Sequence, residues 1–283
     1  MSSAGRDKMN KAQYAKQGEY KTASLMVIAS SREVKDGEVV FAGTGLPMIA
    51  IMMAQHTSAP EAVLIYEAGT FDGQVISVPS SVAGPRAAYQ ASVSSGVYDA
   101  FGILQHGLEK GWVDLGFLGG AEIDQYGNVN ATSIGDYLHP KTRFPGSGGN
   151  VDINGMSSRI VYIMVQEKRR FREQVDYCTS PGWRVKTWRN GKLEWITRKE
   201  CYQKKFRGGP SAVITDMAVF RFDVDTGLMY LDTVHPGHSV EEVKENVGFD
   251  LDVSRCSGET IPPTYAELEL LYNEIDPEGV FLT

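Results

Sequence analysis

The 283-residue chain has few cysteines and no long apolar run. Its three cysteines, Cys178, Cys201 and Cys256, form no CxxC pair, which argues against a zinc ribbon or a redox dithiol. The longest apolar runs, Ser24–Ser30 and Leu46–Ala54, are too short to span a bilayer. The first residues lack the apolar core of a signal peptide. We therefore expect a cytoplasmic protein without a membrane partner, since sparse cysteines suit a reducing compartment.

Positive charge is also in short supply. The chain holds 28 Lys and Arg against 35 Asp and Glu, a net charge of −7, which disfavours general nucleic-acid binding. At 42% hydrophobic and 22% charged residues, the composition is that of a globular protein able to bury a substantial core. This composition excludes disorder, collagen and coiled coil. We expect a polar arm over residues 1–21 and a single domain over residues 22–283.

One stretch departs from the acidic balance. Residues Arg184–Arg207 carry nine Lys and Arg against two Glu, with tryptophans among them. Such a pattern can form a nucleic-acid surface, a contact with another subunit, or an attractive surface for a phosphorylated ligand. It also suits a solvated β-hairpin that turns at Asn190-Gly191. The hairpin and the subunit contact are the favoured interpretations.

Short apolar runs alternate with helical patterns along the chain. This alternation predicts an α/β fold, with a mostly parallel open sheet and helices on both faces. In such sheets ligands bind where the strands end. Asp99 is the predicted N-cap of its helix. We expect strands at 38–42, 62–66, 115–118, 160–165 and 212–214, and helices at 22–34, 47–55, 99–110, 241–246 and 265–274.

Several common catalytic signatures are missing. The chain has no P-loop and no GxSxG elbow. Gly43-Thr44-Gly45 begins like a dinucleotide fingerprint, but the third glycine is absent, so a tight strand-to-helix turn is favoured. His235-Pro236-Gly237-His238 is expected to be a turn with exposed imidazoles. No carboxylate pattern accompanies it, so we expect no metal site.

Glu67 is the most informative single residue. It directly follows the apolar run Val63–Tyr66, which places its carboxylate at the carboxyl end of a strand. Ala68 and Gly69 leave room for a ligand beside it. A lone glutamate in this position is more often a solvated loop residue than a nucleophile, and spacing alone does not decide between the two.

Eleven short motifs, taken together, favour the nucleophile over the solvated loop residue as the interpretation of Glu67. In their order along the chain they resemble the B-type subunits of the family I CoA-transferases, from about residue 22 to the C-terminus. The polar arm and the basic stretch lie outside the pattern. The motifs are GTGLP at 43–47, YEAG at 66–69, GGAEID at 119–124, YGNVN at 126–130, TSIGDY at 132–137, HPKTRF at 139–144, GSGG at 146–149, EKRRF at 167–171, TSPGW at 179–183, GFDLDV at 248–253 and IDP at 275–277.

The resemblance implies that Glu67 is the nucleophile of a ping-pong transferase. Its carboxylate would attack an acyl-CoA thioester, and the CoA thiolate would open the resulting anhydride to give a glutamyl-CoA thioester. A carboxylate acceptor would then take the CoA. By the same resemblance, Gly148 and Gly149 are the expected oxyanion-hole glycines. Gly119 and Gly120 are candidates to line the CoA site, with a simple tight turn as the alternative. Candidates for substrate-facing loop residues are Ala68, Gly69, Gly43 and Gly45.

The resemblance also implies partners. Coenzyme A enters as a thioester substrate, and no permanently bound cofactor is expected. A homologous A-type subunit would complete a hetero-oligomer, and a glutaconate-like dicarboxylate is the implied substrate class. Some relatives instead act as acyl-CoA hydrolases or decarboxylases on carbon–carbon bonds, but they have lost the glutamate that Glu67 matches. A non-catalytic ligand-binding module is a further alternative, although the chain has no candidate helix-turn-helix with a basic recognition helix.

Overall fold

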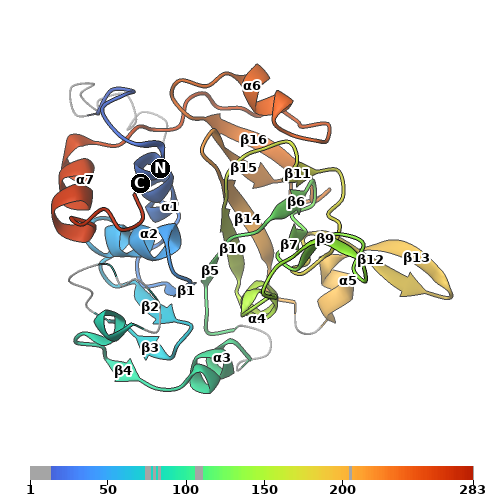
Figure 1. The fold of residues 1–283 in the computed structure, drawn as a ribbon, viewed down its shortest axis with the longest axis horizontal. Helices are drawn as coiled ribbons and strands as arrows, with labels where there is room; N and C mark the ends of the chain where they lie inside the picture. Colours follow the sequence, from blue (N-terminus) through green and yellow to red (C-terminus); the bar gives the residue numbers. More distant parts are fainter. Residues whose placement is uncertain are drawn as a thin grey trace.

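The chain folds around a nine-stranded sheet with the order β16-β15-β14-β10-β5-β1-β2-β3-β4 (Figure 1). The structure, a computed structural model, describes residues 14–73, 78, 81, 84–105, 111–203 and 206–282. The five strands from β14 to β2 pair in parallel, and the two strands at either edge are antiparallel. The strands are β1 (Val39–Ala42), β2 (Val63–Tyr66), β3 (Thr70–Phe71), β4 (Val93–Ser94), β5 (Leu115–Leu118), β10 (Arg159–Ile163), β14 (Gly209–Ile214), β15 (Ala218–Phe222) and β16 (Met229–Val234).

The central strands are short apolar runs because both of their faces are covered. In β1, Val40 and Ala42 belong to one hydrophobic core while Phe41 belongs to the other. In β2, Leu64 and Tyr66 alternate with Ile65 in the same way. Side chains of a strand point to opposite faces in turn, so a strand buried on both sides must be apolar throughout. The predicted α/β class, with a mostly parallel sheet, is confirmed.

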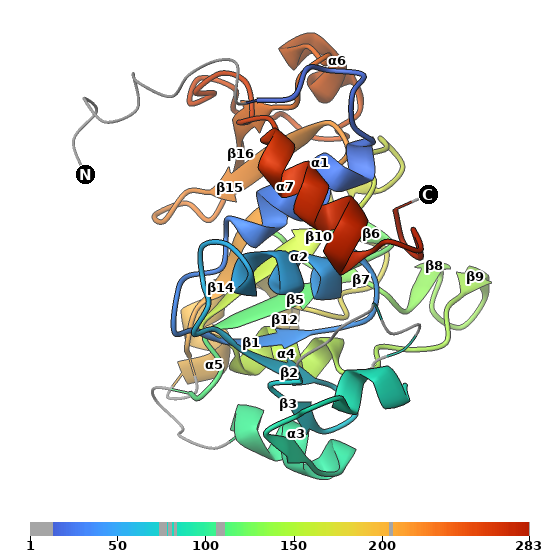
Figure 2. The same cartoon turned by 90° about the vertical axis from the view of Figure 1, so that its left-hand side faces the viewer.

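One face of the sheet carries helices from both ends of the chain. Figure 2 shows α7 lying over α1 and α2 on this face. Arg32, just after α1, forms a 3.0 Å ion pair with Glu267 of α7, which joins the two. Nearly all of α1 and α2 is buried, as expected for helices that are apolar all round. The helices are α1 (Thr22–Ser31), α2 (Leu46–Gln55) and α7 (Tyr265–Leu270), which continues as a π-helix over Leu271–Ile275.

The opposite face is covered by short helices and a small sheet. The second core includes Ala100 and Leu104 of α3, Ile153 of α4, and Ile123 and Phe171 of the small sheet. These elements bring distant segments together over the sheet. They are α3 (Val97–Gln105), α4 (Asn150–Met156), and the sheet of β11 (Phe171–Arg172), β6 (Glu122–Asp124) and β7 (Val129–Asn130). Further elements are the β8 (Ser133–Gly135) and β9 (Pro140–Arg143) pair, α6 (Val240–Glu245), and the 3-10 turn Pro85–Ala88, whose Ala87 belongs to the first core.

The predicted N-cap at Asp99 is wrong. Helix α3 begins two residues earlier, and Asp99 lies within its first turn. There its Oδ2 accepts a hydrogen bond of 3.2 Å from the backbone N–H of Gly96. A first-turn carboxylate that accepts a hydrogen bond from the N–H at the start of its helix forms half of a capping box. Such a residue resembles an N-cap in sequence, so the predicted start of the helix falls a few residues too late. Residues 106–110 of the predicted helix lie outside the described residues.

The basic stretch forms the predicted hairpin. Strands β12 (Arg184–Arg189) and β13 (Lys192–Thr197) pair antiparallel and turn at Asn190 and Gly191, whose φ angles are 51° and 77°. Two positive φ angles in a two-residue loop match the twist of the strands that it joins. The hairpin projects from the body in Figure 1 and leaves Trp188 73% exposed. A short helix, α5 (Arg198–Tyr202), follows with a capping box at Thr197.

The end of the predicted N-terminal arm contacts the C-terminal part of the chain. Tyr14 forms an isolated bridge with Thr264, and the Ala15 N–H donates to the Pro263 carbonyl. Residues 1–13 of the arm lie outside the described residues. Across the described ranges, no helix is both long and apolar enough to cross a membrane.

The prediction of exposed imidazoles at 235–238 is wrong for His235, which is 1% exposed. Its Nδ1 lies 2.8 Å from the Thr260 hydroxyl and its Nε2 lies 2.8 Å from the Thr215 carbonyl. Burial lowers the pKa of His235 to about 4. The imidazole is therefore neutral near pH 7 and bridges Thr260 and Thr215 inside the fold. Both partners are distant in sequence, so the pattern of histidines along the chain does not reveal this burial.

We predict that His235 makes the fold acid-sensitive. Its pKa falls from 6.5 to about 4 on folding, so the unfolded chain binds the proton more tightly. Its contribution is fully present above pH 6.5 and is lost as the pH falls toward 4, by at most about 3 kcal/mol. Urea unfolding across this range measures the loss, which His235→Gln should reduce.

The comparison of variants separates this effect from that of Asp124. Burial raises the pKa of Asp124 to about 7, so this carboxyl favours the folded state as the pH falls. The Asp124 effect is common to both proteins and cancels in the difference between them. Identical pH profiles for the wild type and His235→Gln would contradict the assignment.

Candidate active site

Glu67 lies in a tight turn at the carboxyl end of β2. The Gly69 N–H donates to the Tyr66 carbonyl over 2.9 Å, which makes Glu67 and Ala68 the two central residues of the turn. Glu67 is half-buried. Tyr66 points to the α1–α2 core, so the alternation of the strand directs the next side chain toward the face that carries α3 and α4.

Gly69 is glycine for two physical reasons. Its φ angle is 102°, in the left-handed region. A Cβ atom there would lie 2.4 Å from the Ser95 carbonyl oxygen and 2.6 Å from that of Gly96. The Ser95 N–H also donates to the Gly69 carbonyl over 2.9 Å. Gly69 therefore packs the Glu67 turn against the segment that leads into α3.

The segment before α4 supplies the second part of the site. A Cβ atom at Gly149 would lie 3.1 Å from Glu67 Oε1, and one at Gly148 would lie 3.9 Å from the same oxygen. The structure thus brings together Glu67, Gly148 and Gly149, which the sequence motifs separate widely. Within the described part of the chain, neither glycine N–H donates a hydrogen bond, and Glu67 has no ion pair or hydrogen bond.

Phe101 is a site residue that the sequence did not indicate. A Cβ atom at Gly149 would lie 2.6 Å from Phe101 Cζ, so the ring touches the same point as the Glu67 carboxylate. The ring also packs on Phe41 of β1, with centroids 5.6 Å apart. An aromatic residue in a helix usually belongs to the core, so no pattern marks it. Phe101 and Tyr98 also line an adjoining cavity of about 750 Å³.

The first glycine loop lies next to this group. In the parallel register Ala42 pairs with Tyr66, so Gly43 is one residue beyond the last pair, beside Glu67. A Cβ atom at Gly43 would meet nothing within 4 Å, which leaves open space there. Gly45, with φ 102°, is instead the N-cap of α2 and serves the strand-to-helix turn.

The second glycine pair is farther from Glu67. Gly119 and Gly120 follow β5, which lies two strands from β2, a separation of about 10 Å. A Cβ atom at Gly120 would lie 2.3 Å from Val129 Cγ1, so close packing explains this glycine. Gly119 is exposed, and a side chain there would make only ordinary contact with the Ile163 carbonyl. The two glycines border the site without touching the carboxylate.

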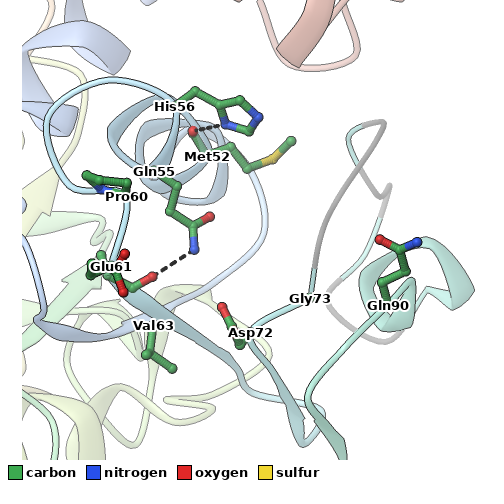
Figure 3. Close-up of a pocket in the computed structure, with 10 residues that line it drawn as sticks. Met52, Gln55, His56, Pro60, Glu61, Val63, Asp72, Gly73 and Gln90 are labelled. Carbon is green, nitrogen blue, oxygen red and sulfur yellow. Dashed lines mark hydrogen bonds between the residues drawn. The ribbon is translucent and has the colours of Figure 1, made fainter.

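A polar pocket of about 430 Å³ lies at the other end of β2 (Figure 3). It lies between the end of α2 and the chain after β3, and none of the predicted site residues lines it. Its His56 Nδ1 lies 2.8 Å from the Met52 carbonyl, and its Gln55 donates to the Ala62 carbonyl. These side chains hold the end of α2 in place, and the candidate site residues lie at the opposite end of the strand.

Comparison with known proteins identifies the family. The family model described as Coenzyme A transferase matches residues 24–246. The chain belongs to the coenzyme A transferase family. It is 40% identical over 265 residues to the B subunit of glutaconate CoA-transferase from Acidaminococcus fermentans, covering 93% of this chain and 95% of that one. Over 89% of this chain and 92% of the relative, it is 34% identical to the B subunit of 3-oxoadipate CoA-transferase from Pseudomonas knackmussii.

Solved structures of similar chains show the same fold. The crystal structure of the Acidaminococcus fermentans glutaconate coenzyme A-transferase superposes with a TM-score of 0.84 at 38% identity, over 94% of this chain and 98% of the other. The decarboxylase AibA/AibB superposes with a TM-score of 0.75 at 25% identity, over 92% and 97% of the two chains. These similarities support a CoA-transferase subunit of the B type.

We predict that the candidate site of this CoA-transferase subunit tolerates a side chain at Gly43 but not at Gly69. Gly69→Ala combines a strained φ with overlap of two carbonyl oxygens, so it should lower the free energy of unfolding by more than about 2 kcal/mol. The matched change Gly43→Ala enters open space and should stay within about 0.5 kcal/mol. Urea unfolding measures both, and equal losses would contradict the packing of Gly69 on Ser95.

Proposed function

We propose that this chain is the catalytic B-type subunit of a CoA-transferase that works through a glutamyl-CoA thioester on Glu67. One observation carries the proposal. In a chain matched to CoA-transferase B subunits over most of its length, the Glu67 carboxylate lies against the unblocked backbone of Gly148 and Gly149.

The chemistry follows from the surroundings of the carboxylate. Without an ion pair or hydrogen bond in the described part of the chain, Glu67 keeps its oxygens free for attack. It attacks the thioester carbon of an acyl-CoA, forms an anhydride and releases the CoA thiolate. The thiolate then attacks the glutamyl carbon of the anhydride, which releases the donor carboxylate and leaves CoA bound to Glu67. A second carboxylate reverses both steps and leaves with the CoA.

A carboxylate is a weak nucleophile, so the tetrahedral intermediate must be stabilised. We assign this role to Gly148 and Gly149, whose Cβ positions lie 3.9 Å and 3.1 Å from Glu67 Oε1 and whose N–H groups donate to no other described group. Because neither residue has a side chain, a thioester oxygen can approach these groups. An oxyanion donor of this kind contributes about 3 kcal/mol to the transition state.

The substrates and the partner belong to the same proposal. Two relatives are B subunits of enzymes named for glutaconate and for 3-oxoadipate, so we propose a dicarboxylate of this general type. Because these relatives are B subunits, we also propose that a homologous A-type subunit is required for activity. Gly43 and Gly119 then lie along the carboxyl edge of the sheet where a CoA thioester approaches.

We predict that Glu67→Ala abolishes CoA transfer, because it removes the atom that bonds to the acyl carbon. The assay uses the chain copurified with its A-type subunit, an acyl-CoA donor and a free dicarboxylate. Borohydride reduction of the loaded enzyme should mark Glu67 in the wild type and nothing in the variant, as read by peptide mass spectrometry.

Two controls complete this experiment. Omitting the A-type subunit should remove the activity, and an unchanged melting temperature should show that Glu67→Ala folds. Wild-type turnover by the assembled variant would refute the mechanism. Decarboxylation or hydrolysis of the acyl-CoA without CoA exchange would instead indicate the chemistry of other family members.

We predict that Gly149→Val slows catalysis more than it harms the fold. The φ angle of Gly149 is −77°, which any residue can adopt, but a Cβ would press on Phe101 and Glu67. The single-turnover rate of glutamyl-CoA formation should fall by at least about tenfold to 100-fold, given the value of an oxyanion donor. A normal rate in this variant would show that the 146–149 loop is only a turn.

A further inference from the structure

Two arginines of the basic stretch reach into the body of the protein, away from the exposed hairpin. Arg207 Nη1 donates to the Leu104 carbonyl over 2.6 Å and to the Met156 carbonyl over 2.7 Å. These carbonyls lie in the last turns of α3 and α4. One guanidinium therefore ties together the C-terminal ends of two helices. A cation is favourable there because the final carbonyls of a helix have no partner within it.

Arg198 holds the middle of α4 in a comparable way. Its side chain is almost completely buried, with 1% of the residue exposed. The guanidinium donates to the Asn154 side chain over 2.9 Å and to the carbonyls of Asn154, Pro181 and Gly208. It also stacks on the Tyr202 ring at 4.6 Å. No carboxylate of the described residues pairs with it, so neutral acceptors alone hold this buried charge.

The two helices held in this way carry the groups that touch Glu67. Phe101 lies on α3, and Gly149 is the N-cap of α4. Helix α4 has only seven residues, too few to be stable without tertiary contacts. Beneath it, a Cβ atom at Gly116 of β5 would lie 2.6 Å from Ile153 Cγ2, so α4 already packs closely on the sheet. The hydrogen bonds of Arg198 and Arg207 therefore add fixed points to a short helix that otherwise rests on packing against the sheet.

We propose that Arg207 and Arg198 are positioning residues that hold α3 and α4 so that Phe101 and Gly149 flank the Glu67 carboxylate. The proposal rests on the proposed role of Glu67, and it gives the inner part of the basic stretch a function in this subunit. Arginine suits the task because its planar fork can bond several carbonyls at fixed angles. Lysine offers a single charged centre and can replace only part of this geometry.

The test compares three variants of the assembled two-subunit enzyme. Arg207→Met removes the bridge, and Arg207→Lys keeps its charge. The matched control is Arg221→Met, since Arg221 also holds two elements together, by ion pairs of 2.6 Å to Glu33 and 3.1 Å to Asp232 on other parts of the fold. Each variant is measured for kcat, KM for acyl-CoA, the borohydride-trapped rate and the melting temperature.

A positioning role predicts a large change in kcat with little change in KM, which a purely structural role does not predict. Arg207→Met should lower kcat and the rate of thioester formation between about tenfold and about 100-fold, because small misplacements at a reacting centre are costly. KM for acyl-CoA should change less than about twofold, and Arg207→Lys should recover part of kcat. Arg221→Met should lower only the melting temperature. Wild-type kcat in Arg207→Met, or an equal loss in Arg221→Met, would overturn the proposal.

A second readout does not depend on activity. Hydrogen exchange of peptides covering 97–105 and 149–156 should be faster in Arg207→Met than in wild type, and unchanged in Arg221→Met. If wild type traps no thioester on Glu67, the proposed function fails. The exchange measurement still tests whether Arg207 holds α3 and α4 together. Unchanged exchange protection of both helices in Arg207→Met would by itself overturn the role of Arg207 in holding them.

Discussion

The absence of a side chain at Gly149 is the steric constraint around which this site is built. Glu67 and Phe101 converge on the space that a Cβ there would occupy, at 3.1 Å and 2.6 Å. The carboxylate and the ring therefore meet bare backbone rather than another side chain. The rest of the local structure maintains this approach: Gly69 presses the Glu67 turn against Ser95, and α4 begins directly after Gly149.

The sheet explains why these groups meet at all. Parallel pairing of β2, β1, β5 and β10 puts all of their carboxyl ends on one edge. The loops that follow them converge on that edge, and the two cores fix which way each side chain points. The arrangement agrees with membership of the coenzyme A transferase family, whose B-type subunits this chain matches along nearly its whole length.

The parts of the structure with strong local signals could be predicted from the sequence. The central strands are short apolar runs, and Asn190-Gly191 marks its hairpin, so both appear where expected. Signals that depend on tertiary contact were missed or misplaced. The sequence pattern indicates that Phe101 is a core residue. It predicts an exposed His235 because the partners of this histidine, Thr215 and Thr260, are distant in sequence. The roles of the glycines at 119–120 and 148–149 likewise depend on neighbours that only the fold supplies.

The contact between Glu67 and Gly149 joins positions 82 residues apart, since 149 minus 67 is 82. Between them the chain forms β3, β4, α3, β5, the small strands β6 and β7, and the β8–β9 pair, and α4 follows directly after Gly149. Bringing together residues so far apart in sequence costs chain entropy before the contacts form, and for this reason parallel sheets fold slowly. During synthesis, Glu67 is made well before Gly149, so a nascent chain displays this carboxylate before the backbone that it packs on exists.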